Sequence, residues 1–163
     1  MKKWVAAALI GAALLFSPFH RTDVSELLPI QTLSLRVSDG WCLLETDSGL
    51  WGQGRSFAFA LEDLKRTAPG VVELSTAKQL VICAGAEGYA DELLSTEVLR
   101  PGTELYQGAA DVDVTDADAY LSRHHVEATV ARARAAQLRN EELKLPTLTG
   151  GEGRYRIIDR ERT

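Results

Sequence analysis

The stretch LPIQTLSLRVSDGWCLLET, residues 28–46, decides how the rest of the chain folds. Its first part alternates, with Leu33, Leu35 and Val37 on one side and Thr32, Ser34 and Arg36 on the other. This period of two predicts a half-buried β-strand. Asp39-Gly40 separates it from a second apolar run over residues 41–46, and both turn positions tolerate positive φ. We therefore expect a β-hairpin to open the domain.

Strand and helix patterns alternate after the hairpin. Ser56 is a suitable N-cap for a helix over residues 57–68, which a Pro-Gly dipeptide then ends. Residues 79–84 are apolar on both faces, as expected for a central strand. A helix over residues 87–98 and a strand over residues 105–110 follow. Short connections between strand, helix and strand predict a right-handed crossover and a parallel strand pair.

The remaining segments complete the predicted sheet. Residues 47–55, which are rich in glycine, are expected to continue the second strand irregularly or to form a loop. Thr115, with Asp118 three residues later, predicts the cap of a third helix. Residues 126–142 predict a fourth helix, and residues 154–158 a last short strand. The apolar face of the fourth helix holds only alanines, Val130 and Leu138, so we expect it to pack weakly.

The N-terminal residues are typical of a targeting segment. Lys2 and Lys3 precede an apolar run over residues 4–16, which fits a secretory h-region and reaches a marginal membrane span only when extended to Phe19. Small residues are missing from the expected cleavage position, so an uncleaved signal-anchor is favoured over a cleaved signal peptide. The position of the lysines predicts that the domain lies outside the cytoplasm.

These patterns predict an α/β (α+β) fold. We expect a mixed β-sheet of about five strands with an N-terminal hairpin and three to four helices, preceded by an N-terminal hydrophobic helix. Residues 1–21 form the signal-anchor or signal peptide, and residues 22–163 form one extracytoplasmic α/β domain.

The charge balance excludes some partners. Of 18 basic residues, Lys2, Lys3 and Arg21 lie in the first 21 positions, which hold no acidic residue, so 15 basic residues remain against 23 acidic ones. A nucleic-acid-binding domain needs cations to replace the counterions around phosphates. The acidic remainder therefore argues against nucleic acid, and also against a domain lying flat on an anionic lipid surface.

Two short patterns suggest catalysis or metal binding, and each has a structural interpretation that we favour. Ser56, within Gly-Arg-Ser-Phe-Ala, loosely resembles a nucleophile elbow, but it also suits a helix N-cap. His124 and His125 are adjacent, so on a helix they point about 100° apart and do not chelate one ion. A histidine near a helix C-terminus is favourable by itself.

The acidic and glycine-rich stretches are also interpreted structurally. The acidic stretch contains Asp111, Asp113, Asp116 and Asp118. It loosely resembles a calcium loop, but Asp116 stands where that loop needs glycine. We therefore expect the carboxylates to surround the start of the third helix. Gly49, Gly52 and Gly54 lack the ending of a phosphate-binding loop, and residues 150–153 are expected to form a flexible loop. We assign no catalytic, cofactor-binding or metal-binding residue, and predict a non-enzyme that needs no cofactor.

Cys42 and Cys83 are the only two cysteines of the chain. Outside the cytoplasm they could form one disulfide. Each lies in an apolar predicted strand, where an unpaired cysteine behaves as a small hydrophobic residue. We favour two unpaired buried thiols, and a disulfide between them stays open.

The order of short motifs resembles the N-terminal domain of the C-subunit of spore germinant receptors, the Ger(x)C family. The motifs span most of residues 23–158 and are individually degenerate. They are Asp-x-x-Glu-Leu at 23–27, Ala60-Leu61 in a helix, LVICAGAEGYADELL at 80–94, Val-Leu-Arg-Pro at 98–101 before LYQGAADVDV, Leu-Pro-Thr-Leu at 145–148 and Gly-Arg-Tyr-Arg-Ile at 153–157.

This resemblance implies a non-catalytic, extracytoplasmic interaction module associated with sporulation or germination, working beside membrane-embedded receptor subunits. Two features differ from the family. Ser17 and Phe19 stand where a lipobox cysteine could be, so a helical anchor would replace the lipid. The family subunits are also longer. The alternative is an exported ligand-binding or envelope-assembly domain unrelated to spores.

Overall fold

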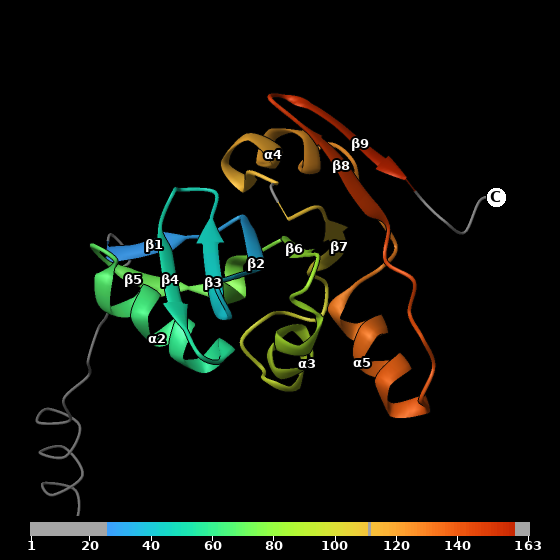
Figure 1. The fold of residues 1–163 in the computed structure, drawn as a ribbon, viewed down its shortest axis with the longest axis horizontal. Helices are drawn as coiled ribbons and strands as arrows, with labels where there is room; N and C mark the ends of the chain where they lie inside the picture. Colours follow the sequence, from blue (N-terminus) through green and yellow to red (C-terminus); the bar gives the residue numbers. More distant parts are fainter. Residues whose placement is uncertain (1–25, 111, 159–163) are drawn as a thin grey trace, which may run out of the picture.

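A computed structural model describes residues 26–110 and 112–158. These ranges contain four α-helices, one 3₁₀ turn and nine strands in two sheets (Figure 1). In chain order the elements are β1 (Leu27–Pro29), β2 (Thr32–Ser38), β3 (Trp41–Thr46), β4 (Trp51–Gly54), α2 (Phe57–Thr67), β5 (Val71–Glu73), η2 (Leu74–Thr76), β6 (Gln79–Cys83), α3 (Glu87–Ser95), β7 (Glu104–Gly108), α4 (Val114–Leu121), α5 (Val130–Arg139), β8 (Thr147–Gly151) and β9 (Arg154–Ile158). The fold is mixed α/β, as predicted.

The main sheet has seven strands in the order β4-β3-β2-β6-β7-β8-β9. β2, β6, β7 and β8 run parallel, while β3 and β4 at one end and β9 at the other run antiparallel to their neighbours. The parallel pair of β6 and β7 around α3 is confirmed. β1 and β5 form a separate parallel pair.

The opening hairpin is confirmed. β2 and β3 pair antiparallel from Leu33 opposite Thr46 to Ser38 opposite Trp41. Asp39 and Gly40 both have positive φ, at 50° and 77°, so this turn has the backbone that suits the twist of the paired strands.

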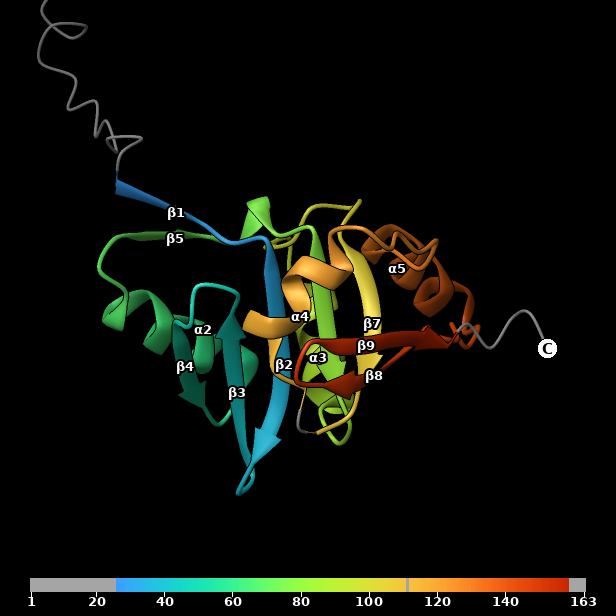
Figure 2. The ribbon, with the colours of Figure 1, turned by 90° about the horizontal axis from the view of Figure 1, so that it is seen from above.

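Helices cover both faces of the sheet (Figures 1 and 2). On one face α2, α3 and α5 enclose the larger apolar cluster, which includes Leu80 and Ile82 of β6. On the other face α4 packs over Val81 and Cys83 of the same strand. Because β6 is covered on both sides, all five of its residues are buried, as predicted for a central strand.

The prediction of a half-buried first strand is wrong. Thr32 and Ser34, on the face expected to meet solvent, are fully buried. The cause is tertiary: α4 packs against β2 on that face, and the hydroxyl of Thr32 hydrogen-bonds Asp118 of α4 at 2.6 Å.

The predicted sheet of about five strands was too small. β4, β8 and the short pair β1 and β5 were missed, because glycines and short length hide their period of two. β4 reads Trp-Gly-Gln-Gly and pairs with β3 where an irregular strand or loop was expected. Residues 150–153, expected to be a flexible loop, form the end of β8 and a tight turn into β9, with Glu152 and Gly153 at φ 51° and 73°.

The helix count of three to four is confirmed, but several boundaries differ from the prediction. α3 ends at Ser95 and α5 covers only Val130–Arg139. Asp113, and not Thr115, caps α4, since its carboxylate accepts from the amides of Thr115 and Asp116. Leu138, expected on the packed face of α5, is 88% exposed.

The predicted N-terminal hydrophobic helix and targeting segment lie outside the described residues. Among the residues that the structure does describe, no helix has the length and apolar character needed to cross a bilayer.

Candidate functional site

Three exposed aromatic side chains lie on the elements at the β4 end of the sheet. Trp41 of β3, Trp51 of β4 and Phe59 of α2 are 43%, 53% and 63% exposed. The guanidinium of Arg55 lies 5.5 Å from the ring centre of Trp41, a distance suited to a cation–π contact. Trp41, Arg55 and Phe59 line one shallow pocket. We call Trp41, Trp51, Arg55 and Phe59 the aromatic edge.

Strand alternation places the tryptophans on the outer face. Gly54 lies opposite Cys42, and Gly52 opposite Leu44, while Trp51 lies opposite Glu45. Cys42 and Leu44 face the buried cluster under α2, so Trp41 and Trp51 point away from that helix. Phe59 reaches the same edge from the exposed side of α2.

Two glycines let α2 lie directly on β4. A β-carbon on Gly52 would be 2.4 Å from the carbonyl oxygen of Ala60 and 2.4 Å from the amide nitrogen of Leu64. A β-carbon on Gly54 would meet the amide nitrogen of Ala60 at 2.4 Å. These glycines therefore serve close packing, which the sequence interpretation did not foresee.

β4 is an edge strand, and one of its outward amides is already occupied. The amide of Gln53 donates to Asp63 Oδ2 of α2 at 3.1 Å. Arg66 donates to the other oxygen of that carboxylate at 2.6 Å, and this contact lowers the pKa of Asp63. The carboxylate of Asp63 therefore occupies one backbone donor of the edge strand β4, which makes pairing with a strand of another molecule less favourable.

Ser56 is the N-cap of α2, as predicted. Its hydroxyl oxygen accepts from the amide of Phe59 at 3.3 Å. The carboxylate of Glu92, on α3, accepts from the amides of Phe57 and Ala58 at 2.9 and 3.1 Å. Two side chains from different parts of the chain therefore satisfy the free amides at this helix start.

Replacing Ser56 by alanine is expected to lower the free energy of unfolding by about 1 kcal/mol, because one amide of α2 loses its acceptor. Urea denaturation of wild type and variant measures the difference. Ser122→Ala, which removes an exposed hydroxyl bonded to Ala119 within α4, is the matched control and should change stability by less than about 0.5 kcal/mol. An equal loss in both variants would contradict the capping role.

The two histidines have separate structural contacts. The ring of His124 stacks on Tyr120 with centroids 4.0 Å apart, and its Nδ1 lies 2.8 Å from the carbonyl oxygen of Tyr120. His125 Nδ1 lies 2.8 Å from Glu104 Oε1, and the other oxygen of Glu104 lies 2.8 Å from the hydroxyl of Tyr106. Within the described ranges no three histidine, cysteine or acidic side chains converge as metal ligands.

Sequence reasoning missed the contact of His125 with Glu104. The two residues are distant in the sequence, and strand β7 brings the carboxylate to the end of α4. Burial and the adjacent carboxylate raise the pKa of Tyr106, so its hydroxyl stays protonated and can donate. The arrangement fixes the connection after α4 to the sheet.

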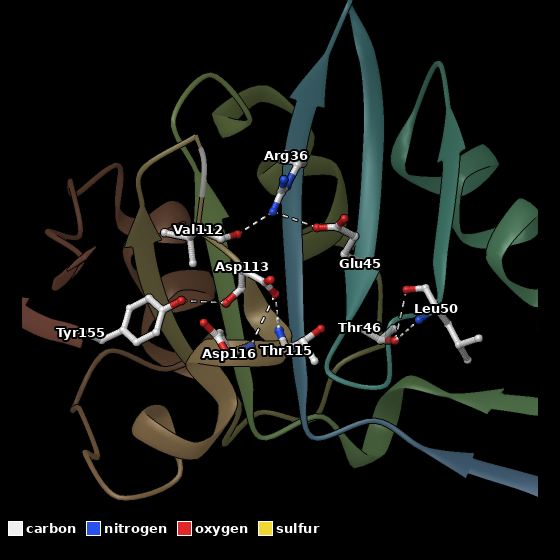
Figure 3. A network of polar contacts seen from close by, with 9 residues as sticks. All are labelled: Arg36, Glu45, Thr46, Leu50, Val112, Asp113, Thr115, Asp116 and Tyr155. Carbon is white, nitrogen blue, oxygen red and sulfur yellow. Dashed lines mark hydrogen bonds and ion pairs between the residues drawn. The ribbon is translucent and has the colours of Figure 1, made fainter. Parts of the chain in front are cut away.

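The acidic stretch divides between two roles, and Asp111 lies outside the described residues. Asp113 caps α4, and its carbonyl accepts from the hydroxyl of Tyr155 at 3.2 Å (Figure 3). On the face of the sheet that α4 covers, Arg36 of β2 forms an ion pair with Glu45 at 2.8 Å and donates to the carbonyl of Val112 at 2.5 Å. These contacts attach the start of α4 to the sheet.

Asp118 does not lie at the helix start as expected. It accepts from Thr32 and faces Asp47, whose carboxylate oxygens lie 3.3 and 3.4 Å from the amide nitrogen of Gln31. Burial and the nearby charge of Asp118 raise the pKa of Asp47. No sequence pattern indicates this carboxylate pair, because Asp47 follows β3 and Asp118 belongs to α4.

The two cysteines lie on opposite faces of the sheet. Cys42 belongs to the cluster under α2 and α3, and Cys83 to the cluster under α4. The sheet therefore separates their sulfur atoms, which excludes a disulfide between them in this fold. Burial, with a smaller effect of Glu92, raises the pKa of the Cys42 thiol to about 12, so it is protonated at neutral pH.

Comparison with known proteins identifies no relative. No family model matches the chain, and the searches of curated proteins and of solved structures gave no match.

Proposed function

We propose that this chain is a non-catalytic interaction module, held on the extracytoplasmic side of a membrane by its N-terminal segment. In this proposal it works by protein–protein contact beside membrane-embedded subunits, as the resemblance to the first domain of germinant receptor C-subunits implies. Sporulation or germination is then its setting. It needs no cofactor and contacts no nucleic acid.

The aromatic edge is the observation that carries the proposal. Tryptophan and arginine are the residue types that dominate binding energy at protein interfaces. Trp41 and Phe59 are exposed in one shallow pocket with Arg55, and an exposed apolar patch of this kind is typical of an interaction site. Trp51 is exposed further along the same outer face, opposite Glu45. Fixed positions on β3, β4 and α2 let these side chains bind with little loss of conformational freedom.

The second candidate function is an exported ligand-binding domain unrelated to spores. A cavity of about 560 Å³ between α3 and α5 favours it, since this volume is in the range of small-molecule sites. The two functions use different surfaces and can be tested separately.

Photocrosslinking tests the interaction module directly. The full chain, with a benzoylphenylalanine in place of Phe59, is expressed in a spore-forming host, and membranes are irradiated. We expect a crosslink to an integral membrane protein, identified by mass spectrometry as a germinant receptor subunit. The same photoreactive group in place of Leu138 is the matched control, because Leu138 is also exposed and apolar but lies on α5.

The alternative outcomes are distinct. A crosslink from position 59 to an envelope protein without a spore role would keep the aromatic edge as the interaction site and contradict the germinant-receptor setting. Equal crosslinking from positions 59 and 138, or none from position 59, would contradict the aromatic edge as the interaction site. Finding the full chain only in the soluble cytosolic fraction would contradict the membrane location.

A further inference from the structure

The cavity between α3 and α5 lies beside the carboxyl ends of two parallel strands. Ile82 is the fourth residue of β6 and Gln107 the fourth of β7, and both line it. In open α/β sheets the crevice beyond the carboxyl ends of the strands is where ligands bind. This cavity is separate from the aromatic edge, with which it shares no lining residue.

Small side chains create the cavity. Ala90 of α3 and Ala133 and Ala136 of α5 face it, so the two helices have little side-chain volume between them. Polar contacts hold the helices in place: Arg134 donates to the carbonyl oxygens of Leu94 and Thr96 at the end of α3. The weak apolar face of the fourth helix, evident in the sequence, thus becomes the wall of a pocket.

The floor and the mouth of the cavity differ in chemistry. Buried apolar side chains such as Ile82, Leu94 and Leu105 form the floor. The charged residues that line it are four carboxylates and one ammonium group: Glu87, Asp91, Glu141, Glu142 and Lys144. Glu141 forms an ion pair with Arg139 at 3.8 Å, which leaves three carboxylates against Lys144. An excess of carboxylates beside a low-dielectric floor attracts a cation and repels an anion.

Polar groups at the cavity are available to a ligand. Asp91 accepts from the side chain of Gln137 at 2.9 Å, which fixes its carboxylate at the mouth between α3 and α5. Among the described residues, the carboxylate of Glu142 and the side-chain amide of Gln107 have no hydrogen-bond or ion-pair partner. A few polar groups converging on an apolar pocket are the usual composition of a small-molecule site.

From this geometry we propose that the cavity binds a small organic ammonium ion with an apolar body. The apolar part fills the space over Ile82, Leu94 and Leu105, and the ammonium group lies among the carboxylates at the mouth. The amide oxygen of Gln107 provides a further acceptor. This inference names the ligand class for the cavity that favours the second candidate function, and it does not depend on the interaction module.

Fluorine NMR titration tests the site with three probes of similar size and different charge. The full chain in phosphatidylcholine nanodiscs is titrated with 4-fluorophenethylamine, with 2-(4-fluorophenyl)ethanol and with 3-(4-fluorophenyl)propionate, and empty nanodiscs correct for partition into lipid. We expect saturable binding of the amine. The carboxylate probe should bind at least about tenfold more weakly, since it meets like charges at the mouth.

Two variants locate the binding, each with a matched control. Ala136→Leu fills the cavity and should weaken amine binding at least about tenfold, whereas Ala131→Leu, on the exposed side of the same helix, should not change it. Glu142→Gln should weaken binding about two- to fivefold, and Glu62→Gln on α2 should have no effect. Circular dichroism confirms that each variant is folded.

Three results would overturn the proposal. They are the absence of saturable amine binding, equal binding of the amine and the carboxylate probe, and wild-type amine affinity in both Ala136→Leu and Glu142→Gln. Each of these leaves the crosslinking result at Phe59 unaffected, so failure of this inference is distinguishable from failure of the proposed function.

Discussion

Replacing Gly52 by alanine is expected to lower the free energy of unfolding by about 3 kcal/mol or more, among the largest effects of any single methyl group in this fold. The added β-carbon would be 2.4 Å from two backbone atoms of α2, the carbonyl oxygen of Ala60 and the amide nitrogen of Leu64. Backbone atoms cannot rotate away as a flexible side chain can. The whole helix must therefore move away from β4, which disrupts the buried interface between them.

Gly88→Ala is the matched control for this experiment. Gly88 lies in α3, and apart from its chain neighbours and the backbone of its own helix no atom lies within 4 Å of the position of its β-carbon. Alanine is the better helix former, so this variant should be as stable as wild type or more stable by up to about 1 kcal/mol. Urea denaturation followed by tryptophan fluorescence measures both variants. If Gly52→Ala were as stable as Gly88→Ala, the close approach of α2 to β4 would be wrong.

Truncating Leu93 to alanine is expected to lower the free energy of unfolding by about 2 to 5 kcal/mol. Leu93 lies on α3 with no exposed surface and belongs to the cluster between the sheet and the helices. The variant loses the transfer energy of the leucine and leaves a cavity that its neighbours fill only in part. Urea denaturation and differential scanning calorimetry measure the loss.

Leu138→Ala provides the control with the same chemical change in another helix. Leu138 is 88% exposed on α5, so its truncation should change stability by less than about 0.5 kcal/mol. A loss for Leu138→Ala comparable to that of Leu93→Ala would place Leu138 in a packed interface. That result would restore the helix face that the sequence pattern predicted and contradict the observed one.

Local patterns predicted the elements that local chemistry controls. The hairpin at Asp39-Gly40 was predicted because two adjacent residues suit a turn with positive φ. The start of α2 at Ser56 was predicted because an N-cap hydroxyl acts within three residues. The central position of β6 followed from its continuous apolar run. Each of these signals depends on neighbours in the sequence.

The candidate sites could not be found in this way. Trp41 and Trp51 are exposed because they lie on the face of β3 and β4 that points away from α2, and Phe59 is exposed because it lies on the outer side of α2. No local sequence pattern indicates that these three aromatic residues meet solvent. The alanines of α5 indicated weak packing, but not that α3 would lie across a cavity from them. Partners such as Glu92 for the start of α2 come from distant elements, so sequence spacing gives no sign of them.

The amino-acid sequence alone determined the mixed α/β class, the opening hairpin, the order of most strands and helices, and the acidic charge. The tertiary structure decided that Thr32 and Ser34 are buried, that glycine-rich β4 is a strand, and that an aromatic edge and a cavity exist. The physical reason is the range of the forces: turns and caps are set by adjacent residues, whereas burial depends on which distant element packs on each face.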